Sequence, residues 1–303
     1  PLRPVKAGTK PRPPKAGGDR SCPGTRTMAP SPARIEKYHG TGNDFVVVDA
    51  AEWPLDEVVR LVAAICDRHR GVGADGVLHV ERRPDRLDDG LDAFMTVINR
   101  DGSRPQMCGN GVRCVARYLV ERHGASADLV IGSDAGPRAC RVFTDRAPVE
   151  VDVDMGVVRS DGVVECEAAG RTWRFEAVDV GNPHAVVFEA VTDALADAVG
   201  AALNAPGSPF AEGVNVEFVV AGDARLDVVV YERGVGRTQA CGTGACAVAF
   251  AAWETGVASG DEVVVGLPGG DLRIRKREGR VWMRGDAEHV FSGAVSAGWV
   301  SER

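Results

Sequence analysis

The sequence predicts a mixed α/β protein built from two similar halves, and three observations support this class. Two segments, residues 107–119 and 240–253, share a Cys-Gly-x-Gly pattern followed by an apolar run with helical character. Short strand-like stretches surround each of them, and landmark residues recur in both halves at matching spacing. The composition, with 44% hydrophobic and 26% charged residues, is typical of a soluble globular protein with a full core.

The first 33 residues differ from the rest of the chain. They contain eight of the 17 prolines, seven Lys or Arg residues and one acid. This composition indicates a disordered leader, so residues 1–33 are excluded from the fold prediction. A basic tail that contacts nucleic acid is the alternative interpretation, but the net charge of -7 argues against a nucleic-acid binder.

The first half, residues 34–155, opens with a strand, a glycine-rich turn and a second strand. A helix is predicted over about 55–68, because Val58, Val62 and Ile65 fall on one helical face. The remaining elements predicted for this half are the glycine-rich segment 71–76, strands near 77–80 and 94–99, the helix after Cys108, and short strands from about 129 to 155.

The second half, residues 156–303, repeats this order. Its predicted elements are strands within 163–180, a turn at 181–184 with a strand at 185–188, a helix over about 192–203, strands at 214–220 and 226–231, and the helix after Cys241. The final strands are expected to pack back on the first half.

Equal spacings measure the repeat. The matching pairs are Asn43–Gly76 and Asn182–Asn215, each 33 positions apart, and Asn99–Cys108 and Glu232–Cys241, each nine positions apart. Four landmarks in the same order indicate a duplicated α/β unit. A cleft between two such halves would bring both cysteines to one ligand.

Each cysteine of the repeated motif is expected at a helix N-terminus, where the helix dipole and the unpaired amides favour a thiolate. The amides after Cys108 and Cys241 can bind a carboxylate. One thiol could then remove a proton from the α-carbon of the ligand while the other delivers a proton to the opposite face, which inverts the configuration. The other cysteines of the folded part are predicted to be structural, namely Cys66, Cys114, Cys140, Cys166 and Cys246.

The sequence offers no visible site for a cofactor, a metal ion or a membrane. After residue 27 the lysines are Lys37 and Lys276, neither in a glycine-rich site, which disfavours pyridoxal phosphate. No dinucleotide or P-loop pattern occurs, and the spacing of the cysteines and the six histidines disfavours zinc. The apolar runs are too short to span a bilayer, and the absence of Cys-x-x-Cys pairs and of a secretory segment indicates a reducing cytoplasm.

In order along the chain, these motifs resemble those of the diaminopimelate epimerase family. The resemblance covers about residues 34–300 and rests on residues 39–45, 71–76, 99–103, 107–114, 181–184, 214–215, 232–244 and 287–293. It implies a cofactor-independent isomerase that interconverts LL- and meso-2,6-diaminopimelate, on the route to lysine and peptidoglycan precursors. It also implies two domains, each a mostly antiparallel, barrel-like sheet around a central helix, with the active site in the cleft between them, in a cytoplasmic homodimer.

The same resemblance implies the roles of individual residues. Cys108 and Cys241 match the two acid/base cysteines. The expected substrate contacts are Asn43, Asn99, Asn182, Asn215, Glu232 and Arg233, together with the backbone amides of Gly109, Asn110, Gly242 and Thr243; His184 and Glu232 match polar residues beside the cysteines. The chain departs from the family pattern at Gly76, where some members have glutamine, and at residues 104–106, where an acidic residue is expected.

Arg233 is also the best cation for a second, distal carboxylate, because its planar guanidinium can bind one bidentately. Other interpretations remain open. Asparagines beside turns often only form the turn. A racemase for proline, 4-hydroxyproline or histidine would use the same chemistry, but proline-racemase relatives carry Cys-Gly-His where this chain has Cys108-Gly109-Asn110. A cysteine hydrolase with His184 as base would leave the second motif unexplained, and a carboxylate-binding protein without catalysis would need neither thiol.

Overall fold

The computed structural model describes residues 33–83, 90–222 and 224–303. The expected leader, residues 1–33, lies outside the described residues except for Ala33, which begins the first strand. The first half contains β1 (Ala33–Gly40), β2 (Asn43–Asp49), α1 (Leu55–Cys66), β3 (Gly76–Arg82), β4 (Ala93–Asn99), α2 (Gly109–His123), β5 (Asp128–Gly132), β6 (Arg138–Phe143) and β7 (Glu150–Gly156).

The second half contains β8 (Arg159–Ala168), β9 (Arg171–Asp179), β10 (Pro183–Val187), α3 (Asp193–Leu203), β11 (Asn215–Ala221), β12 (Arg225–Glu232), β13 (Gly236–Arg237), α4 (Gly242–Glu254) and β14 (Glu262–Leu267). It closes with β15 (Gly270–Arg277), β16 (Arg280–Asp286), β17 (Glu288–Val295) and α5 (Ala297–Ser301). The proposed boundary between the halves, at residues 155 and 156, falls at the end of β7.

The two halves repeat one pattern of strand pairing. β2 pairs parallel with β3 across α1, β3 pairs antiparallel with β4, and β4 pairs parallel with β5 across α2. The second half repeats these pairings. β10 pairs parallel with β11 across α3, β11 pairs antiparallel with β12, and β12 pairs parallel with β14 across α4. In each half two antiparallel pairings follow, β5–β6–β7 and β14–β15–β16. The predicted class, mixed α/β with two similar halves, is confirmed.

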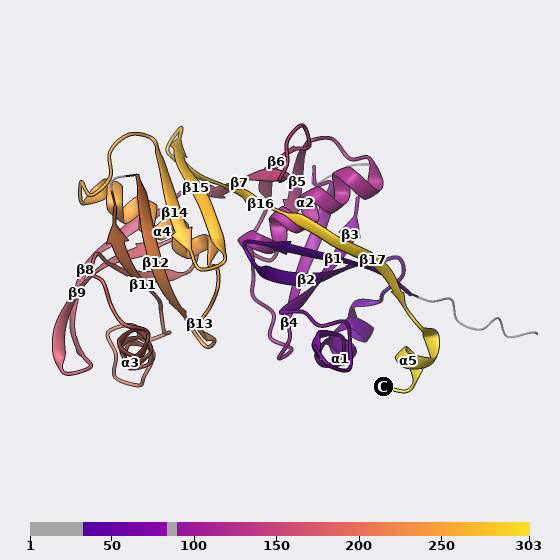
Figure 1. Ribbon diagram of the computed structural model, residues 1–303, viewed down its shortest axis with the longest axis horizontal. Helices are drawn as coiled ribbons and strands as arrows, with labels where there is room; N and C mark the ends of the chain where they lie inside the picture. The colour runs from indigo at the N-terminus through magenta and orange to yellow at the C-terminus, as the bar shows by residue number, and fades with distance from the viewer. Residues whose placement is uncertain (1–32, 84–89, 223) are drawn as a thin grey trace, which may run out of the picture. The chain divides into compact units, whose positions relative to one another are not determined.

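The last strands of the chain connect the halves. β16 pairs antiparallel with β7, and β17 pairs antiparallel with β1, with Ala33 opposite Val295. Figure 1 shows β17 running beside β1 towards α5. In the second half β8 pairs with β9 in the corresponding position. The strand that completes the first half is therefore supplied by the C-terminal end of the chain.

Local backbone chemistry explains where the elements begin and end. The strands predicted within 163–180 are β8 and β9, and Ala169 (φ 50°) and Gly170 (φ 80°) turn the chain between them. α1 ends at Cys66, two residues earlier than predicted, because Asp67 has an extended backbone. The predicted helices after the two cysteines are confirmed as α2 and α4.

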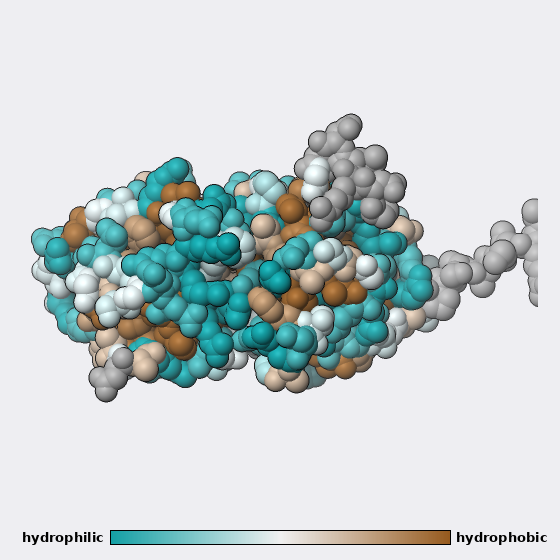
Figure 2. All heavy atoms as spheres, turned by 90° about the horizontal axis from the view of Figure 1, so that it is seen from above, coloured by the Kyte–Doolittle hydropathy of each residue, from teal (hydrophilic) through white to brown (hydrophobic). Residues whose placement is uncertain are grey.

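Apolar side chains gather around the helices. α2 and α4 pack in one shared hydrophobic cluster, while α1 and α3 each lie in a cluster of their own. On the face shown in Figure 2, hydrophilic residues predominate and hydrophobic residues lie in several separate groups. Four of the cysteines predicted to be structural are buried, Cys66, Cys114, Cys140 and Cys246, and Cys166 is partly buried. Within the described ranges, no helix has the length and apolar character needed to cross a membrane.

Candidate active site

Cys108 and Cys241 cap the N-termini of α2 and α4, as predicted. The Sγ atom of Cys108 accepts a hydrogen bond from the amide of Gly111 at 3.4 Å, and that of Cys241 accepts one from the amide of Gly244 at 3.3 Å. Both cysteines have an extended backbone, which places each side chain beside the first helical turn. The two halves therefore present a thiol in the same local geometry.

The two helix N-termini meet. An ideal Cβ on Gly242 would lie 3.6 Å from the Cα of Gly109, and 3.0 Å from the Sδ of Met283 on β16. An ideal Cβ on Gly109 would lie 3.0 Å from the Cε of the same methionine. The unpaired amides at the start of α2 and α4 are thus gathered in one place, where they can bind a single anion.

Burial changes the expected chemistry of both thiols. The sequence predicted that the helix N-termini would favour thiolates, but burial raises the pKa of Cys108, and it raises the pKa of Cys241 well above the usual range. The charges of Glu232 and Glu217 raise the pKa of Cys241 further, whereas the positive charge of Arg113 counteracts the shift at Cys108. The expectation was wrong because loss of hydration outweighs the contribution of about 0.3–1 kcal/mol from a helix end.

The side of Cys241 is lined by polar groups of β10, β11 and α4. The hydroxyl of Thr243 lies 3.4 Å from Sγ of Cys241 and accepts a hydrogen bond from Nδ2 of Asn182 at 3.5 Å. The Oδ1 atom of Asn182 is 3.1 Å from Nε2 of His184, whose Nδ1 is 2.7 Å from Oε1 of Glu217. Asn182, His184 and Thr243 are therefore brought to Cys241.

Glu232, at the end of β12, also faces the thiol of Cys241. Its carboxylate accepts a hydrogen bond from the hydroxyl of Thr238. Burial raises the pKa of Glu232, while the hydrogen bonds from Thr238 and Cys241 and the charge of His184 counteract the shift. Because Glu232 also raises the pKa of Cys108, this carboxyl group influences both thiols.

On the side of Cys108, the side-chain amide of Asn110 connects the halves. The amide of Asn110 donates to Oδ1 of Asn43 at 3.2 Å and to the carbonyl of Ala240 at 3.4 Å. Asn43 in turn donates to Asp75 at 2.9 Å. Among the described residues, Oδ1 of the buried Asn110 has no hydrogen-bond partner, so it is an acceptor that a ligand could use.

The remaining sequence-predicted asparagines lie in supporting positions. Asn215 accepts a hydrogen bond from the amide of Arg233 at 3.0 Å and donates to the carbonyl of Pro183 at 3.2 Å, which ties together the starts of β10 and β11 and the end of β12. Asn99 donates to the hydroxyl of Ser103 at 3.0 Å. This side-chain hydrogen bond stays within the turn after β4, while the backbone of Asn99 pairs with Gly76 of β3.

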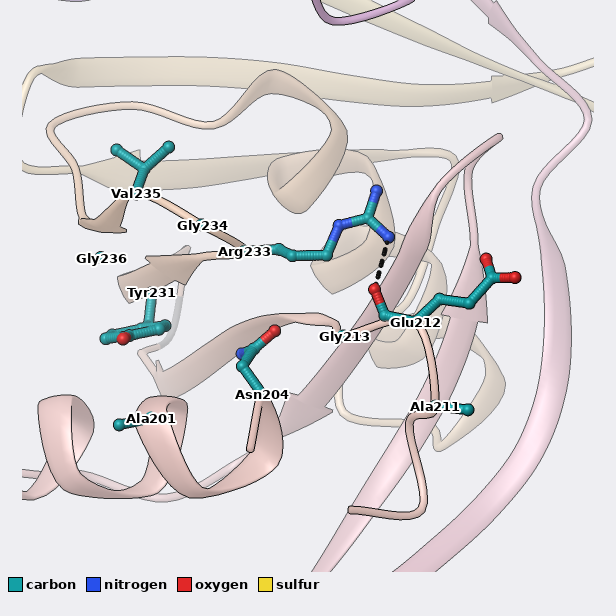
Figure 3. A pocket seen from close by; sticks show the side chains of 10 residues that line it. All are labelled: Ala201, Asn204, Ala211, Glu212, Gly213, Tyr231, Arg233, Gly234, Val235 and Gly236. Atoms are coloured by element: carbon teal, nitrogen blue, oxygen red, sulfur yellow. Dashed lines mark hydrogen bonds between the residues drawn. The ribbon is translucent and has the colours of Figure 1, made fainter. Parts of the chain in front are cut away.

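Arg233 lines a pocket of about 650 Å³ on the second half, which Figure 3 shows together with Tyr231, Asn204 and Glu212. Its guanidinium points to the carbonyl of Glu212 and donates to it at 2.9 Å. Neither cysteine is among the residues that line this pocket. Arg233 therefore holds the loop before β11, and its guanidinium remains exposed to solvent.

At Gly76, where some family members have glutamine, the neighbouring backbone leaves no room for a side chain. An ideal Cβ at this position would lie 2.8 Å from the carbonyl oxygen of Ile98, across the antiparallel pair of β3 and β4. A glutamine could not replace Gly76 without a shift of one strand. The segment 104–106 is held by its last residue, because the carbonyl of Gln106 accepts a hydrogen bond from the amide of Ala135.

Sequence reasoning missed two buried charged residues beside the cysteines. Glu217 is 0% exposed on β11, and Arg113 is 0% exposed on α2. The guanidinium of Arg113 donates to the carbonyl of Asp286 at 2.9 Å and to the hydroxyl of Thr41 at 3.0 Å. The signal was present in both cases, since each is a charged residue inside an otherwise apolar run.

Comparisons with known proteins show the family of this chain. The family described as diaminopimelate epimerase matches residues 35–160 and 176–290. The diaminopimelate epimerase of Rhodococcus jostii is 41% identical over 282 residues, which cover 88% of this chain and 98% of that protein. The diaminopimelate epimerase of Streptomyces coelicolor is 41% identical over 279 residues, which cover 87% of this chain and 96% of that protein.

Solved structures of lower identity share the fold. A hydroxyproline epimerase from Agrobacterium vitis has a TM-score of 0.66 at 16% identity, and a probable proline racemase from Agrobacterium radiobacter has a TM-score of 0.64 at 17% identity. Each comparison covers 87% of this chain and 92% of the other. At these identities the likeness concerns the architecture alone.

Proposed function

Because this chain belongs to the diaminopimelate epimerase family, we propose that it interconverts LL- and meso-2,6-diaminopimelate with Cys108 and Cys241 as its two acid/base groups. The reaction is an isomerisation on the route to lysine and peptidoglycan precursors. The observation that carries the assignment of the two residues is the meeting of two cysteine-capped helix N-termini at Gly109 and Gly242.

The geometry supports inversion at the α-carbon. The amides that follow the two cysteines bind the carboxylate next to the reacting carbon and stabilise the charge that builds on it during deprotonation. One thiolate takes the α-proton, and the electron pair of the C–H bond stays on the carbon. The thiol on the opposite face then delivers its proton to that carbon, and its sulfur becomes the thiolate.

The surroundings raise the pKa of Cys241 more strongly than that of Cys108. Cys108 is close to the positive charge of Arg113, whereas Cys241 faces the carboxyl groups of Glu232 and Glu217. Cys108 therefore gives up its proton more readily, and Cys241 retains its own. As a coupled pair they titrate together, so a pH profile reports the pair and not one residue.

The other polar groups have places around the substrate in this proposal. Asn43 contacts the substrate, and the backbone amides of Gly109, Asn110, Gly242 and Thr243 surround its reacting carboxylate. Glu232 and His184 adjust the charge beside Cys241. Arg233 binds the distal amino-carboxylate end, where a guanidinium is suited to a carboxylate, with Asn99, Asn182 and Asn215 as neutral partners.

The chain is further proposed to act as a homodimer in the cytoplasm without a cofactor. These three points rest on the family resemblance and on the sequence patterns that disfavour pyridoxal and nucleotide binding. Sedimentation equilibrium of the purified protein measures the oligomeric state, and activity after exhaustive dialysis against a chelator tests for dependence on a metal ion.

The decisive experiment measures epimerisation of diaminopimelate in deuterated water with wild type, Cys108→Ala and Cys241→Ala. Wild type is expected to place solvent deuterium at the inverted α-carbon, and both variants are expected to lose epimerisation while keeping the native circular dichroism spectrum. Epimerisation that survives in either variant excludes the two-base mechanism. Proline and 4-hydroxyproline serve as comparison substrates.

A further inference from the structure

A buried acid lies behind the cysteine of the second half. Glu217, on β11, is 0% exposed, and its Oε1 atom is 2.7 Å from Nδ1 of His184, which is 1% exposed. An ideal Cβ on Gly244 would lie 2.7 Å from the same oxygen. The carboxylate of Glu217 therefore packs against the helical turn whose amide binds Sγ of Cys241.

A continuous path of polar contacts connects Glu217 to Cys241. From Glu217 it passes to His184 at 2.7 Å, from His184 to Asn182 at 3.1 Å, from Asn182 to Thr243 at 3.5 Å, and from Thr243 to Sγ of Cys241 at 3.4 Å. His184 and Asn182 each use one atom towards the neighbour before them and another atom towards the neighbour after them. Donors and acceptors can therefore follow one order along the path. The contact between Asn182 and Thr243 is the longest of those between nitrogen and oxygen.

The donor and acceptor roles along this path follow from its first member. Both ring nitrogens of His184 face oxygen atoms, and both are satisfied when each carries a proton. The carboxylate of Glu217 accepts the hydrogen bond from Nδ1, and Oδ1 of Asn182 accepts the one from Nε2. A proton on Nε2 orients Asn182 with its oxygen towards the ring, so its NH₂ group donates to Thr243 and leaves the hydroxyl proton of Thr243 directed at the sulfur of Cys241.

We propose that Glu217 is a positioning residue for proton transfer at Cys241 and that it acts through His184. This inference rests on the proposed function. When Cys241 gives its proton to the α-carbon, the electron pair of the S–H bond stays on sulfur, and the oriented hydroxyl of Thr243 donates a hydrogen bond to the new thiolate. Without that donor the charge would form in a buried space with one hydrogen bond fewer.

Stability alone does not account for Glu217. Among the described residues, its Oε2 atom is buried and has no hydrogen-bond partner. A buried carboxyl group with one unpaired oxygen is costly, and an apolar side chain of similar size would avoid that cost. The position is therefore better explained by the charge that Glu217 supplies to His184.

The inference makes an asymmetric prediction, because the path reaches Cys241 and not Cys108. Glu217→Gln keeps the shape of the side chain and removes its charge. It is expected to lower kcat for epimerisation about 10- to 100-fold, a part of the roughly 10²- to 10⁴-fold that positioned proton-transfer groups contribute. Exchange of the α-hydrogen with solvent deuterium, without inversion, is expected to stay within about twofold of wild type for the isomer that Cys108 deprotonates.

Glu36→Gln is the matched control. Glu36 forms a second Glu–His pair, with its Oε2 atom 2.8 Å from Nε2 of His289, between β1 and β17. This variant measures the effect on activity of removing the charge of a carboxylate that is hydrogen-bonded to a histidine outside the site. It is expected to leave both the epimerisation rate and the exchange rate unchanged.

A double-mutant cycle tests whether Glu217 acts through His184. His184→Gln and the double variant with Glu217→Gln are expected to show equal losses of kcat, because the two residues act as one unit. Thr243→Val removes the hydroxyl at the far end of the path while keeping its shape. It is expected to raise the ratio of exchange to epimerisation as Glu217→Gln does, and it keeps the test available if Glu217→Gln folds poorly.

The outcomes separate this inference from the proposed function. Additive losses in the cycle, or equal losses of exchange from both stereoisomers in Glu217→Gln, would overturn the role of Glu217. A wild-type protein that does not epimerise diaminopimelate overturns the proposed function instead. Melting temperatures of all variants, measured by circular dichroism, show whether a loss of rate reflects a loss of folded protein.

Discussion

Gly109 and Gly242, the first residues of α2 and α4, touch each other. An ideal Cβ on Gly242 would lie 3.6 Å from the Cα of Gly109, and the side chain of Met283 packs against both positions. An added side chain at either residue would press first on Met283, while the distance between the helix ends is an ordinary van der Waals contact. It is this contact that places two sets of unpaired amides around one point.

Gly242→Ala is expected to impair activity more than stability. The added Cβ would lie 3.0 Å from Sδ of the flexible Met283, whose side chain can move away. The free energy of unfolding is therefore expected to fall by at most about 1–3 kcal/mol. Met283 also packs against Gly109, so its adjustment disturbs both helix ends, and a displacement of about 1 Å at a reacting site can cost around 100-fold in rate. The check is kcat/KM for diaminopimelate together with the free energy of unfolding in urea.

Gly298→Ala is the control for this prediction. Gly298 lies in α5, and an added Cβ would have no neighbour within 4 Å. This variant is expected to match wild type in both measurements. Normal kcat/KM in Gly242→Ala would contradict the view that the two helix ends must meet for catalysis.

The thiols are expected to be less reactive than free cysteine at neutral pH when no substrate is bound. Burial raises the pKa of both, and it does so most strongly for Cys241 beside Glu232 and Glu217. Since only the thiolate reacts with iodoacetamide, the rate of alkylation should rise with pH beyond the ordinary pKa of about 8.5. Cys108 should react first, because its thiol is less strongly shifted and less buried.

The measurement is the pH dependence of alkylation at each cysteine, followed by peptide mass spectrometry. Cys166 provides a partly buried internal reference in the same chain. Rapid alkylation of Cys241 at pH 7, ahead of Cys108, would show that the carboxyl groups around Cys241 do not hold its proton.

Asp44 is expected to make stability depend on acid pH. Although burial raises the pKa of Asp44, hydrogen bonds from Arg68 and Lys37 hold that pKa far below its ordinary value. A carboxyl group with a lowered pKa in the folded state stabilises the protein fully above its unfolded pKa of about 3.9, and this contribution is lost as pH falls towards the folded value. Asp44→Asn should therefore lower stability most at neutral pH.

Arg68 is half exposed, so the expected loss lies near the lower end of the roughly 1.5–3 kcal/mol typical of a hydrogen bond to a charged group. Urea unfolding at pH 7, 5 and 3.5 measures it, and the difference from wild type should shrink at pH 3.5. Asp227→Asn, which removes an exposed ion pair with Arg225 at 2.7 Å, should cost under about 1 kcal/mol at any pH. A difference for Asp44→Asn that grows with acidity would contradict the assignment.

The parts of the site that depend on local chemistry could be predicted from the sequence. A cysteine before Gly-x-Gly and an apolar run indicates a capped helix, and Cys108 and Cys241 are such caps. The equal spacings also predicted the duplicated strand order, because a repeat preserves local geometry. Both inferences need only neighbouring residues.

Distant packing could be predicted only in outline: the sequence indicates that the final strands pack back on the first half, but not which strands they pair with. The pairing of β17 with β1 joins residues near opposite ends of the chain, and no local pattern in β17 indicates its partner. The raised pKa of Cys241 follows from burial and from Glu217, which lies on another strand. A helix-end argument considers neither, so it predicted the wrong direction for the thiol.

Arg233→Lys tests whether the second half of the chain binds the distal carboxylate of the substrate. In the proposed function the guanidinium of Arg233 binds the distal carboxylate through two hydrogen bonds. A lysine side chain at this position would offer a point charge and lose one of them. The variant is expected to lose about 1.5–3 kcal/mol in kcat/KM for diaminopimelate. It is expected to match wild type in α-hydrogen exchange of lysine, which has no distal carboxylate. Arg237→Lys, at an exposed residue paired with Asp193 and Asp197, is the control and should change neither rate. Equal losses for both substrates would mean that Arg233 acts only by holding the carbonyl of Glu212. A wild type that processes lysine at the same rate as diaminopimelate would contradict the assignment of diaminopimelate as substrate, while the cysteine chemistry would stand.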